Sequence, residues 1–400
     1  MSRLDELIQQ YCPDGVAYVA LETVCLISKG IQFNKKDMHD EGTYPVINGG
    51  INPSGYIEQY NQEEKTITIS QGGASAGFVN WLDTKFWAGA HCYVLKPTNN
   101  VLNRYLFHFV KSKEYKLQEC QYGAGIPALA KSTVASLEIP VPPLEVQSEI
   151  VRILDNFTEL TAELTAELTA RKKQYEYYRD TLLKSSIEIK NVKLGSVCEV
   201  YDGTHQTPKY TNSGVPFVSV ENIDDLYGTT KYISAEDFSK YRIKPRIGDV
   251  FMTRITAGVI GRCTVVDRND DLAYYVSLAL LRPEQSILDS KYLKYYLESG
   301  WGRKELAKRI LWDATPTKIN KDDIGKVYIS LPPLEVQQRL VRVLDNFDSI
   351  CSDLNIGLPA EIEARKKQYE FYRDALLTYA ATDKTILTDR QTDRQTSIMR

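Results

Sequence analysis

The chain has 400 residues, 43% hydrophobic and 25% charged, so it is globular rather than disordered or fibrous and is long enough for several domains. Lysine and arginine number 49 against 52 aspartates and glutamates, and the net charge of −3 excludes a histone-like polybasic protein. A local basic patch on a near-neutral chain can still bind nucleic acid, so these partners are not excluded.

The seven cysteines are widely spaced, form no CxxC pair and have no histidine at the spacing of a metal site. We therefore expect reduced thiols and no metal. The first ten residues are charged, unlike a signal peptide, and no apolar run approaches the roughly 20 residues that cross a bilayer. These patterns predict a cytoplasmic protein without membrane contact.

The first 141 residues carry short runs typical of strands, such as KTITIS at 65–70 and HCYVLK at 91–96, separated by Gly, Asn and Pro. A helical pattern, RYLFHFVKSKEYK, occupies 104–116. This region is expected to form a compact α+β domain.

A long helix is predicted next, because no Gly or Pro interrupts the pattern that follows Pro143 as far as Lys184. About 40 residues make a rod of about 60 Å. Apolar and aromatic residues recur partly at sevens in it, which favours a helix–helix seam. Within it, TELTAELTAELTA at 158–170 repeats a tetrapeptide, and each unit adds about 6 Å. This repeat is either a length-adjustable spacer or simply a good helix composition.

The chain then repeats this organisation. A second α+β region has strand-like runs at 215–220, 249–255 and 262–267 and a helical pattern at 291–300. PPLEVQQRLVRVLDNF at 332–347 matches 142–157 at 12 of 16 positions, and 365–378 matches 171–184 at 11 of 14. In the second copy Gly357 and Pro359 predict a break in the helix. The regions between the shared helices diverge almost completely.

The package of PPLEVQ, LDNF and RKKQYE, occurring after each of two dissimilar domains and carrying TAEL repeats in the first copy, resembles the specificity subunit of type I restriction–modification systems. The resemblance implies an α+β fold: two α/β target-recognition domains separated by two long antiparallel coiled-coil helices, with a pseudo-two-fold internal repeat. It places the first recognition domain at 1–141, the first spacer helix at 142–190, the second domain at 191–331 and the second helix at 332–380. A tail at 381–400, with a TDRQ repeat that has no counterpart in the family, is expected to be disordered.

The same resemblance implies a non-catalytic, bacterial protein. Each domain would read half of a bipartite, asymmetric target in double-stranded DNA, and the helices would set the gap and dock two methyltransferase subunits, through which restriction/translocase subunits join. The sequence contains no P-loop, no GxGxxG and no Asn/Asp-Pro-Pro-aromatic motif. No cofactor is expected in this chain; S-adenosylmethionine, ATP and magnesium would belong to the partner subunits. The alternative is a two-headed scaffold that binds proteins or carbohydrate.

Direct readout needs polar side chains on loops that reach base edges. The glycine-rich candidates could instead only close tight turns. The alternating cations of the KYRIKPR segment are expected on one face of a strand, where they could contact phosphates; the alternative is a solvated edge strand. The candidate DNA-binding residues are Asn48, Ser70, Gln71 and Ser75 in the first domain and Thr204, His205, Gln206, Thr207, Lys209, Lys240, Arg242, Lys244, Arg246, Arg254 and Arg262 in the second.

The duplicated RKKQYE blocks place basic and aromatic side chains at helical spacing, which suits contact with a partner subunit or a polyanion. The alternative is an ordinary solvated helix face with ion pairs within the helix. We expect the two helices to pack on each other, although each could pack only on its own domain. The candidate residues of the helix and partner interface are Phe157, Leu164, Arg171, Tyr175, Tyr178, Leu182, Phe347, Arg365, Tyr369, Tyr372 and Leu376.

Overall fold

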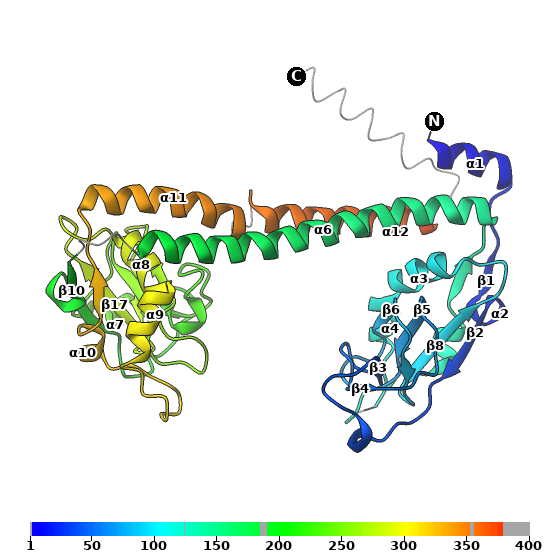
Figure 1. The fold of residues 1–400 in the computed structure, drawn as a ribbon, viewed down its shortest axis with the longest axis horizontal. Coiled ribbons are helices and arrows are strands. Elements are labelled where there is room, and N and C mark those ends of the chain that lie inside the picture. The colour runs from blue at the N-terminus through cyan, green and yellow to red at the C-terminus, as the bar shows by residue number, and fades with distance from the viewer. Residues whose placement is uncertain (1, 124, 185–189, 353–355, 379–400) are drawn as a thin grey trace. The chain divides into compact units, whose positions relative to one another are not determined.

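The computed structural model describes residues 2–123, 125–184, 190–352 and 356–378 (Figure 1). These residues form two compact units. Unit 1 comprises the described residues of 1–165 and 361–400, and unit 2 comprises those of 166–360. The expected C-terminal tail at 381–400 lies outside the described residues.

Unit 1 is an α+β domain of short strands and helices, to which the first part of a long helix is added. Its elements are α1 (Arg3–Tyr11), β1 (Tyr18–Ala20), α2 (Leu21–Val24), β2 (Cys25–Lys29), the 3-10 turn η1 (Lys35–Asp37), β3 (Tyr44–Ile47), β4 (Tyr56–Ile57), β5 (Thr66–Ser70), β6 (Val79–Leu82), β7 (Trp87–Ala88), β8 (Cys92–Pro97), α3 (Asn103–Ser112), α4 (Glu114–Glu119), α5 (Lys131–Ala135), β9 (Glu138–Pro140) and the first part of α6 (Leu144–Leu183).

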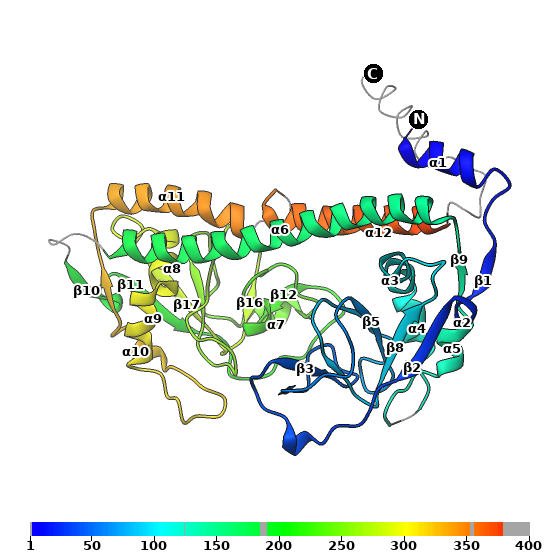
Figure 2. The same cartoon turned by 45° about the vertical axis from the view of Figure 1, so that its right-hand side comes forward.

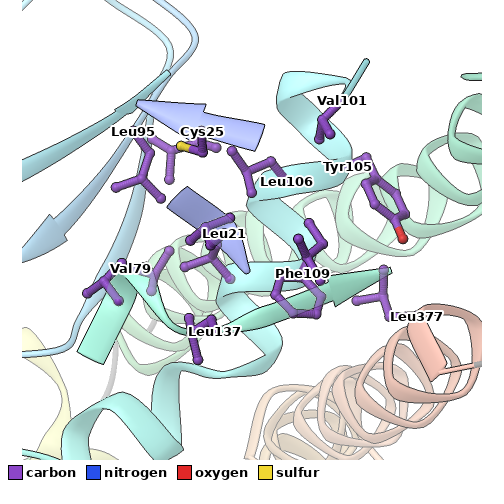
Figure 3. Packing of buried hydrophobic residues seen from close by; sticks show 14 of the residues in the cluster. Leu21, Cys25, Val79, Leu95, Val101, Tyr105, Leu106, Phe109, Leu137 and Leu377 are labelled. Atoms are coloured by element: carbon purple, nitrogen blue, oxygen red, sulfur yellow. The ribbon is translucent and has the colours of Figure 1, made fainter. Parts of the chain in front are cut away.

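The core of unit 1 lies between its main sheet and the helices that cover it. Every residue of β5 is buried, as its β-branched composition and its place between β8 and β6 require. Leu106 and Phe109 of α3 pack onto this sheet together with Leu21, and Leu377 of α12 joins the same cluster (Figure 3). The spacing of buried residues on α3 follows the helical period.

Unit 2 has a corresponding series of elements. They are the second part of α6, β10 (Asn191–Lys193), η2 (Leu194–Ser196), β11 (Cys198–Asp202), β12 (Val215–Val218), η3 (Val220–Asn222), β13 (Tyr232–Ile233), α7 (Ala235–Ser239), β14 (Val250–Thr253), β15 (Cys263–Val265), β16 (Ala273–Tyr274), β17 (Leu278–Pro283), α8 (Ser290–Glu298), α9 (Gly300–Ala307), α10 (Lys321–Ile324), β18 (Tyr328–Ser330), α11 (Leu334–Ser352) and the start of α12 (Leu358–Thr378).

The two domains share one topology although their sequences diverge. The four-stranded sheets have the orders β2-β8-β5-β6 and β11-β17-β14-β15, and the three-stranded sheets have the orders β4-β3-β7 and β13-β12-β16. In each three-stranded sheet one pair is antiparallel and the other is parallel. A two-stranded ribbon closes each domain, with Tyr18 opposite Pro140 in one and Asn191 opposite Ser330 in the other. The internal repeat therefore includes the variable domains.

The long helices follow the predicted pattern. The first, α6, is continuous over 40 residues, and the second repeat is divided into α11 and α12, with Gly357 immediately before α12 and Pro359 in its first turn. The predicted break is confirmed. Figures 1 and 2 both show α11 and α12 alongside α6. The boundary between the units falls within the TAEL repeat of α6, at Thr165.

A buried glutamine joins each repeated helix to its domain. Gln147 has no exposed surface; its side chain accepts a hydrogen bond from the Leu102 amide at 2.8 Å and donates to the carbonyls of Asn100 and Pro142 at 2.9 and 2.7 Å. In unit 2, Gln337 bonds in the same way to Asp289, Ile287 and Pro332. The glutamine of the repeated PPLEVQ motif thus fixes the helix start against the preceding loop.

A second joint lies two turns further along each helix. In unit 1, Asp155 accepts hydrogen bonds from Arg104 and from His108, both at 2.8 Å, and the other ring nitrogen of His108 lies 2.9 Å from the Tyr369 hydroxyl of α12. Burial lowers the pKa of His108 despite its carboxylate partner. In unit 2 the equivalent Asp345 accepts from a lysine and a tyrosine of α8 instead.

Candidate nucleic-acid interface

A polar cluster stands at one edge of the unit 1 sheets, where β3 and β5 end and β8 begins. The Asn48 side-chain oxygen Oδ1 accepts a hydrogen bond from the His91 backbone amide at 3.3 Å, and His91 Nδ1 lies 3.4 Å from Gln71 Oε1. The backbones of Gln71 and His91 are joined as well, at 2.8 Å. His91 is exposed, and the two amide side chains are half-buried. Three side chains that can bond base edges therefore lie together.

Glycines make this close approach possible. A Cβ on Gly89 would lie 2.3 Å from the Asn48 side-chain oxygen, and Gly49 has φ +92°, which disfavours other residues. Residues 121–123 and 125–128 extend the edge, because the Gly73 amide bonds the Pro127 carbonyl at 2.8 Å. The Tyr122 side chain is 58% exposed. The glycine-rich phrase thus closes a turn and also positions polar groups at the surface.

The four residues predicted for the first domain differ in their surroundings. Asn48 and Gln71 lie in the cluster, and Ser75 is half-buried in the loop between β5 and β6. Ser70 is only 5% exposed at the end of β5, so its side chain does not reach the surface, and its contact with a base edge stays a prediction. His91 is not among the predicted residues; its position two residues after Gly89 and directly before β8 was the available signal.

A cleft of about 650 Å³ opens beside the end of β11 in unit 2. It brings together six predicted DNA-binding residues from two segments that are about thirty residues apart in sequence. Aromatic side chains of β11, β16 and the segment after α7 form its floor. Its lining consists of Tyr201, Asp202, Gly203, Thr204, Gln206, Thr207, Pro208, Lys209, Asp237, Lys240, Tyr241, Arg242, Ile243, Tyr274 and Lys321.

The cleft is rich in cations, but one of them is already paired. The Lys240 ammonium bonds Asp237 at 2.8 Å, which lowers the pKa of that carboxyl group. Lys209 and Arg242 are exposed on the rim. Burial raises the pKa of the Tyr241 phenol. A cleft lined by both exposed cations and aromatic side chains suits an anionic ligand with flat groups, such as a polynucleotide.

The two arginines predicted after β14 have different surroundings. The side chain of Arg254 is 7% exposed and pairs with Asp202, which lines the cleft; its direct contact with a base stays a prediction. Arg262 is 45% exposed and pairs with Asp224. His205 is 70% exposed, with Nε2 3.8 Å from Asp202. Sequence alone could not separate the buried arginine from the exposed one.

The KYRIKPR segment is not a strand, contrary to the prediction. Lys240 follows the last residue of α7, and residues 241–246 are bends and irregular chain. The reason lies in local bonds: the Arg246 amide donates to Asp249 at 3.0 Å, and the Lys244 carbonyl accepts from Arg282 at 2.9 Å. The side chains of Arg242, Lys244 and Arg246 are nevertheless exposed.

The predicted helix seam is formed by stacked aromatic pairs, one in each unit. Phe157 stacks on Tyr372 in unit 1 with 5.2 Å between the ring centroids, and Tyr178 stacks on Phe347 in unit 2 with 5.7 Å between them. Because these pairs join equivalent positions of the two repeats, the helices pack on each other as expected. The unit 1 core includes Leu376 and Tyr369, and the unit 2 core includes Tyr175 and Leu182. Leu164 is half-buried. The other two candidates, Arg171 and Arg365, form ion pairs with glutamates of their own helices.

Two features are absent from the described residues. No helix among them has the length and apolar character needed to span a membrane. No group of three or more His, Cys, Asp or Glu side chains among them is arranged to hold a metal ion.

Comparison with known proteins agrees with this architecture. A family model described as the type I restriction modification DNA specificity domain matches twice, at residues 13–171 and 186–364. A Haemophilus influenzae protein named as a type I restriction enzyme specificity subunit is 32% identical over 86% of this chain and 91% of its own length. A type I restriction enzyme specificity subunit of Escherichia coli is 29% identical over 86% of this chain and 89% of its own.

Solved structures show the same fold. The S subunit of a type I restriction–modification system from M. genitalium superposes with a TM-score of 0.54 at 17% identity, covering 93% of this chain and 98% of that one. A chain from a study of complex assembly in the type I system gives 0.59 at 23% identity, covering 91% and 98%. With two copies of the family domain matched over most of its length, this chain belongs to the type I restriction–modification DNA specificity family.

Proposed function

We propose that this chain selects the DNA target of a type I restriction–modification complex, without catalysing a reaction itself. Each domain reads one half of a bipartite, asymmetric double-stranded target, and the helices set the gap between the halves. One observation carries this proposal: the two domains have the same sheet topology but present different polar side chains on the loops at the strand ends. These are an Asn–Gln–His cluster in the first domain and a cationic cleft in the second.

Two unlike edges on one scaffold suit an asymmetric target, because base-edge contacts carry sequence information and phosphate contacts only position the protein. In the first domain the Asn48 and Gln71 amides can pair with adenine. In the second domain Lys209 and Arg242 can neutralise phosphates at the rim of the cleft.

The helices are proposed to dock two methyltransferase subunits, and restriction subunits join through these. Tyr177 is 67% exposed, and Phe371, at the equivalent position of the second repeat, is 45% exposed. Exposed aromatic residues in a duplicated block suit a partner that binds twice. S-adenosylmethionine, ATP and magnesium would be bound by the partner subunits, and the complex would act in the bacterial cytoplasm.

The test is to co-express the chain with the methyltransferase subunit of its complex and to sequence the methylated genome. We expect adenine methylation at one split, asymmetric motif. Gln71→Ala should relax one half of the motif and leave the other half and the gap unchanged, since Gln71 lies in one domain only. Ser136→Ala, an exposed serine of the same domain outside the cluster, is the control and should leave the motif intact.

Two results would contradict the proposal. One is an assembled, active complex that methylates no split motif. The other is a change in both half-sites when only Gln71 is replaced.

A further inference from the structure

A second pocket of unit 2 is separate from the cationic cleft. It has a volume of about 740 Å³ and lies between the end of α6, the helix α9 and the β10–β18 ribbon (Figure 1). Among the described residues, none lines both this pocket and the cleft beside β11. We call it the Trp301 pocket; the residues that define its chemistry are Lys184, Trp301, Lys304, Glu305, Lys308 and Tyr328.

The indole of Trp301 is held in place and presents an exposed ring. Its Nε1 donates a hydrogen bond to the Asp180 carbonyl at 3.1 Å, and the Asp180 carboxylate accepts one from the Gly300 amide at 3.1 Å. These bonds join the start of α9 to the end of α6. Trp301 is nevertheless 36% exposed, and Tyr328 of the ribbon, which also lines the pocket, is 43% exposed. The pocket therefore offers a fixed aromatic surface on which a flat group can stack.

The cations of the Trp301 pocket exceed its anions. Its lining includes three lysines and one glutamate. The carboxylate of Glu305 is already shared, because it pairs with two cations close to it in the chain. Lys184 and Lys304 form no ion pair with any described residue, and their ammonium groups lie 5.6 and 5.2 Å from the centroid of the Trp301 ring. Two cations beside one aromatic ring suit a ligand that has both negative charge and a flat group.

Unit 1 has a corresponding pocket without the tryptophan. A space of about 500 Å³ lies between α4 and the β1–β9 ribbon, and its lining includes Tyr18, which is equivalent to Asn191 in the ribbon of unit 2. Lys113 and Lys116 supply its cations, but its described lining residues include no tryptophan. The pocket thus follows from the shared topology, and only unit 2 equips it with an indole. We therefore expect one complete site per chain.

We propose that the Trp301 pocket binds a phosphorylated nucleoside, with the base stacked on Trp301 and the phosphates bound by Lys184 and Lys304. Its volume lies within the range of about 300–1,000 Å³ that is typical of small-molecule sites. The phosphate charge matches the excess of cations, and the base uses the exposed ring. Two sources offer this chemistry, a free nucleotide and a nucleotide of a single strand, and the experiment separates them. The inference goes beyond the proposed function, because this pocket shares no residue with the cleft proposed to bind the DNA target.

The first probe is ADP that carries a fluorescent N-methylanthraniloyl group, and the second is a fluorescent single-stranded oligo(dT). Fluorescence anisotropy with the full chain measures their binding, without duplex DNA. Unlabelled ADP should displace the first probe better than adenosine or inorganic pyrophosphate does, because each of these supplies only one part of the ligand. Binding of the ADP probe that oligo(dT) does not displace indicates a free nucleotide. Binding of oligo(dT) that Trp301→Leu weakens indicates that a single strand supplies the nucleotide.

Trp301→Leu should weaken binding at least about fivefold, the lower value for one base stacked on an aromatic side chain. Trp301→Phe keeps an aromatic ring and should retain most of the affinity. The matched control is Trp312→Leu, which should bind normally. Trp312 is also exposed and its Nε1 also bonds a carbonyl of α9, but it does not line the pocket.

Lys304→Gln should weaken binding by about two- to fivefold, the range for one exposed ion pair, and should reduce the dependence of binding on salt. Lys193→Gln is its control, because it removes the charge of another exposed lysine of unit 2 that lies outside the pocket, and it should bind normally. Circular dichroism checks that all variants fold.

The proposal is overturned if neither probe binds saturably, if adenosine or pyrophosphate displaces the ADP probe as well as ADP does, or if Trp301→Leu and Trp312→Leu have the same effect. Binding that appears only when Ile187 and Ile189, both outside the described residues, are replaced by serine would also overturn it. That result would assign the pocket to the chain's own link between α6 and β10. None of these measurements uses duplex DNA or methylation, so their failure is distinct from failure of the proposed function.

Discussion

Replacing Gln147 by alanine should loosen unit 1 and leave unit 2 unaffected. The substitution removes three hydrogen bonds and leaves the Leu102 amide and the carbonyls of Asn100 and Pro142 without their partner. A buried polar group left unsatisfied costs about 1–3 kcal/mol, so we expect a loss of at least about 3 kcal/mol. Gln147→Glu should also destabilise unit 1, because a carboxylate cannot donate to the two carbonyls.

Hydrogen exchange is the suitable assay, because a chain with two units has no single unfolding free energy. The amides of α3 should exchange faster in the Gln147→Ala variant, and those of α8 should not. Gln337→Ala should give the opposite result. Ser148→Ala, next to Gln147 and exposed, is the control and should change stability by less than about 0.5 kcal/mol. If Gln147→Ala behaves like Ser148→Ala, or affects both units equally, the glutamine is not the joint described here.

Other expectations can be measured in the same system. Burial lowers the pKa of His108, so the unfolded chain binds a proton at this histidine at a higher pH than the folded chain does. Unit 1 should therefore lose stability as the pH falls below about 6.5, the ordinary histidine pKa. The variant His108→Tyr, which copies Tyr295 of unit 2, should weaken this pH dependence when hydrogen exchange of the α3 amides is measured at decreasing pH. Deleting residues 165–168, one TAEL unit, shortens α6 by about 6 Å and rotates its two ends relative to each other by about 40°. The methylated motif should then keep both half-sites and lose about one base pair from the gap between them. A changed half-site would refute the spacer role. Lys209→Ala should reduce the slope of log affinity against log salt by about 1 for any DNA sequence, if Lys209 contacts a phosphate; binding that is insensitive to salt would favour a protein or carbohydrate scaffold instead.

Much of the fold could be predicted from local patterns. The run at 65–70 forms the central strand β5 because its β-branched residues are buried on both faces. The long helix and the break near Gly357 follow from the distribution of Gly and Pro. The KYRIKPR prediction failed because alternation of charge does not specify a strand when side chains and carbonyls nearby supply other hydrogen-bond partners.

The site could be predicted only by residue type and approximate place. Ser70 and Arg254 have the right chemistry for base contact, but burial, which depends on distant strands, removes both from the surface. Gln147 looks like an ordinary polar residue on a helix surface, because its partners are backbone groups, two of them about 45 residues away. The common topology of the two domains was hidden because a sheet constrains the pattern of apolar residues more than their identities.

The two-stranded ribbons have a consequence for how such a chain can evolve. In each domain the strand that enters from the preceding segment pairs with the strand that leads into the repeated helix, as Tyr18 with Pro140 and Asn191 with Ser330. The polypeptide therefore enters and leaves each domain at one place, and the segment between can be exchanged as a cassette if the new insert again supplies backbone partners for Gln147 or Gln337. Acquiring a new target then requires replacing one insert, while the other half of the molecule continues unchanged.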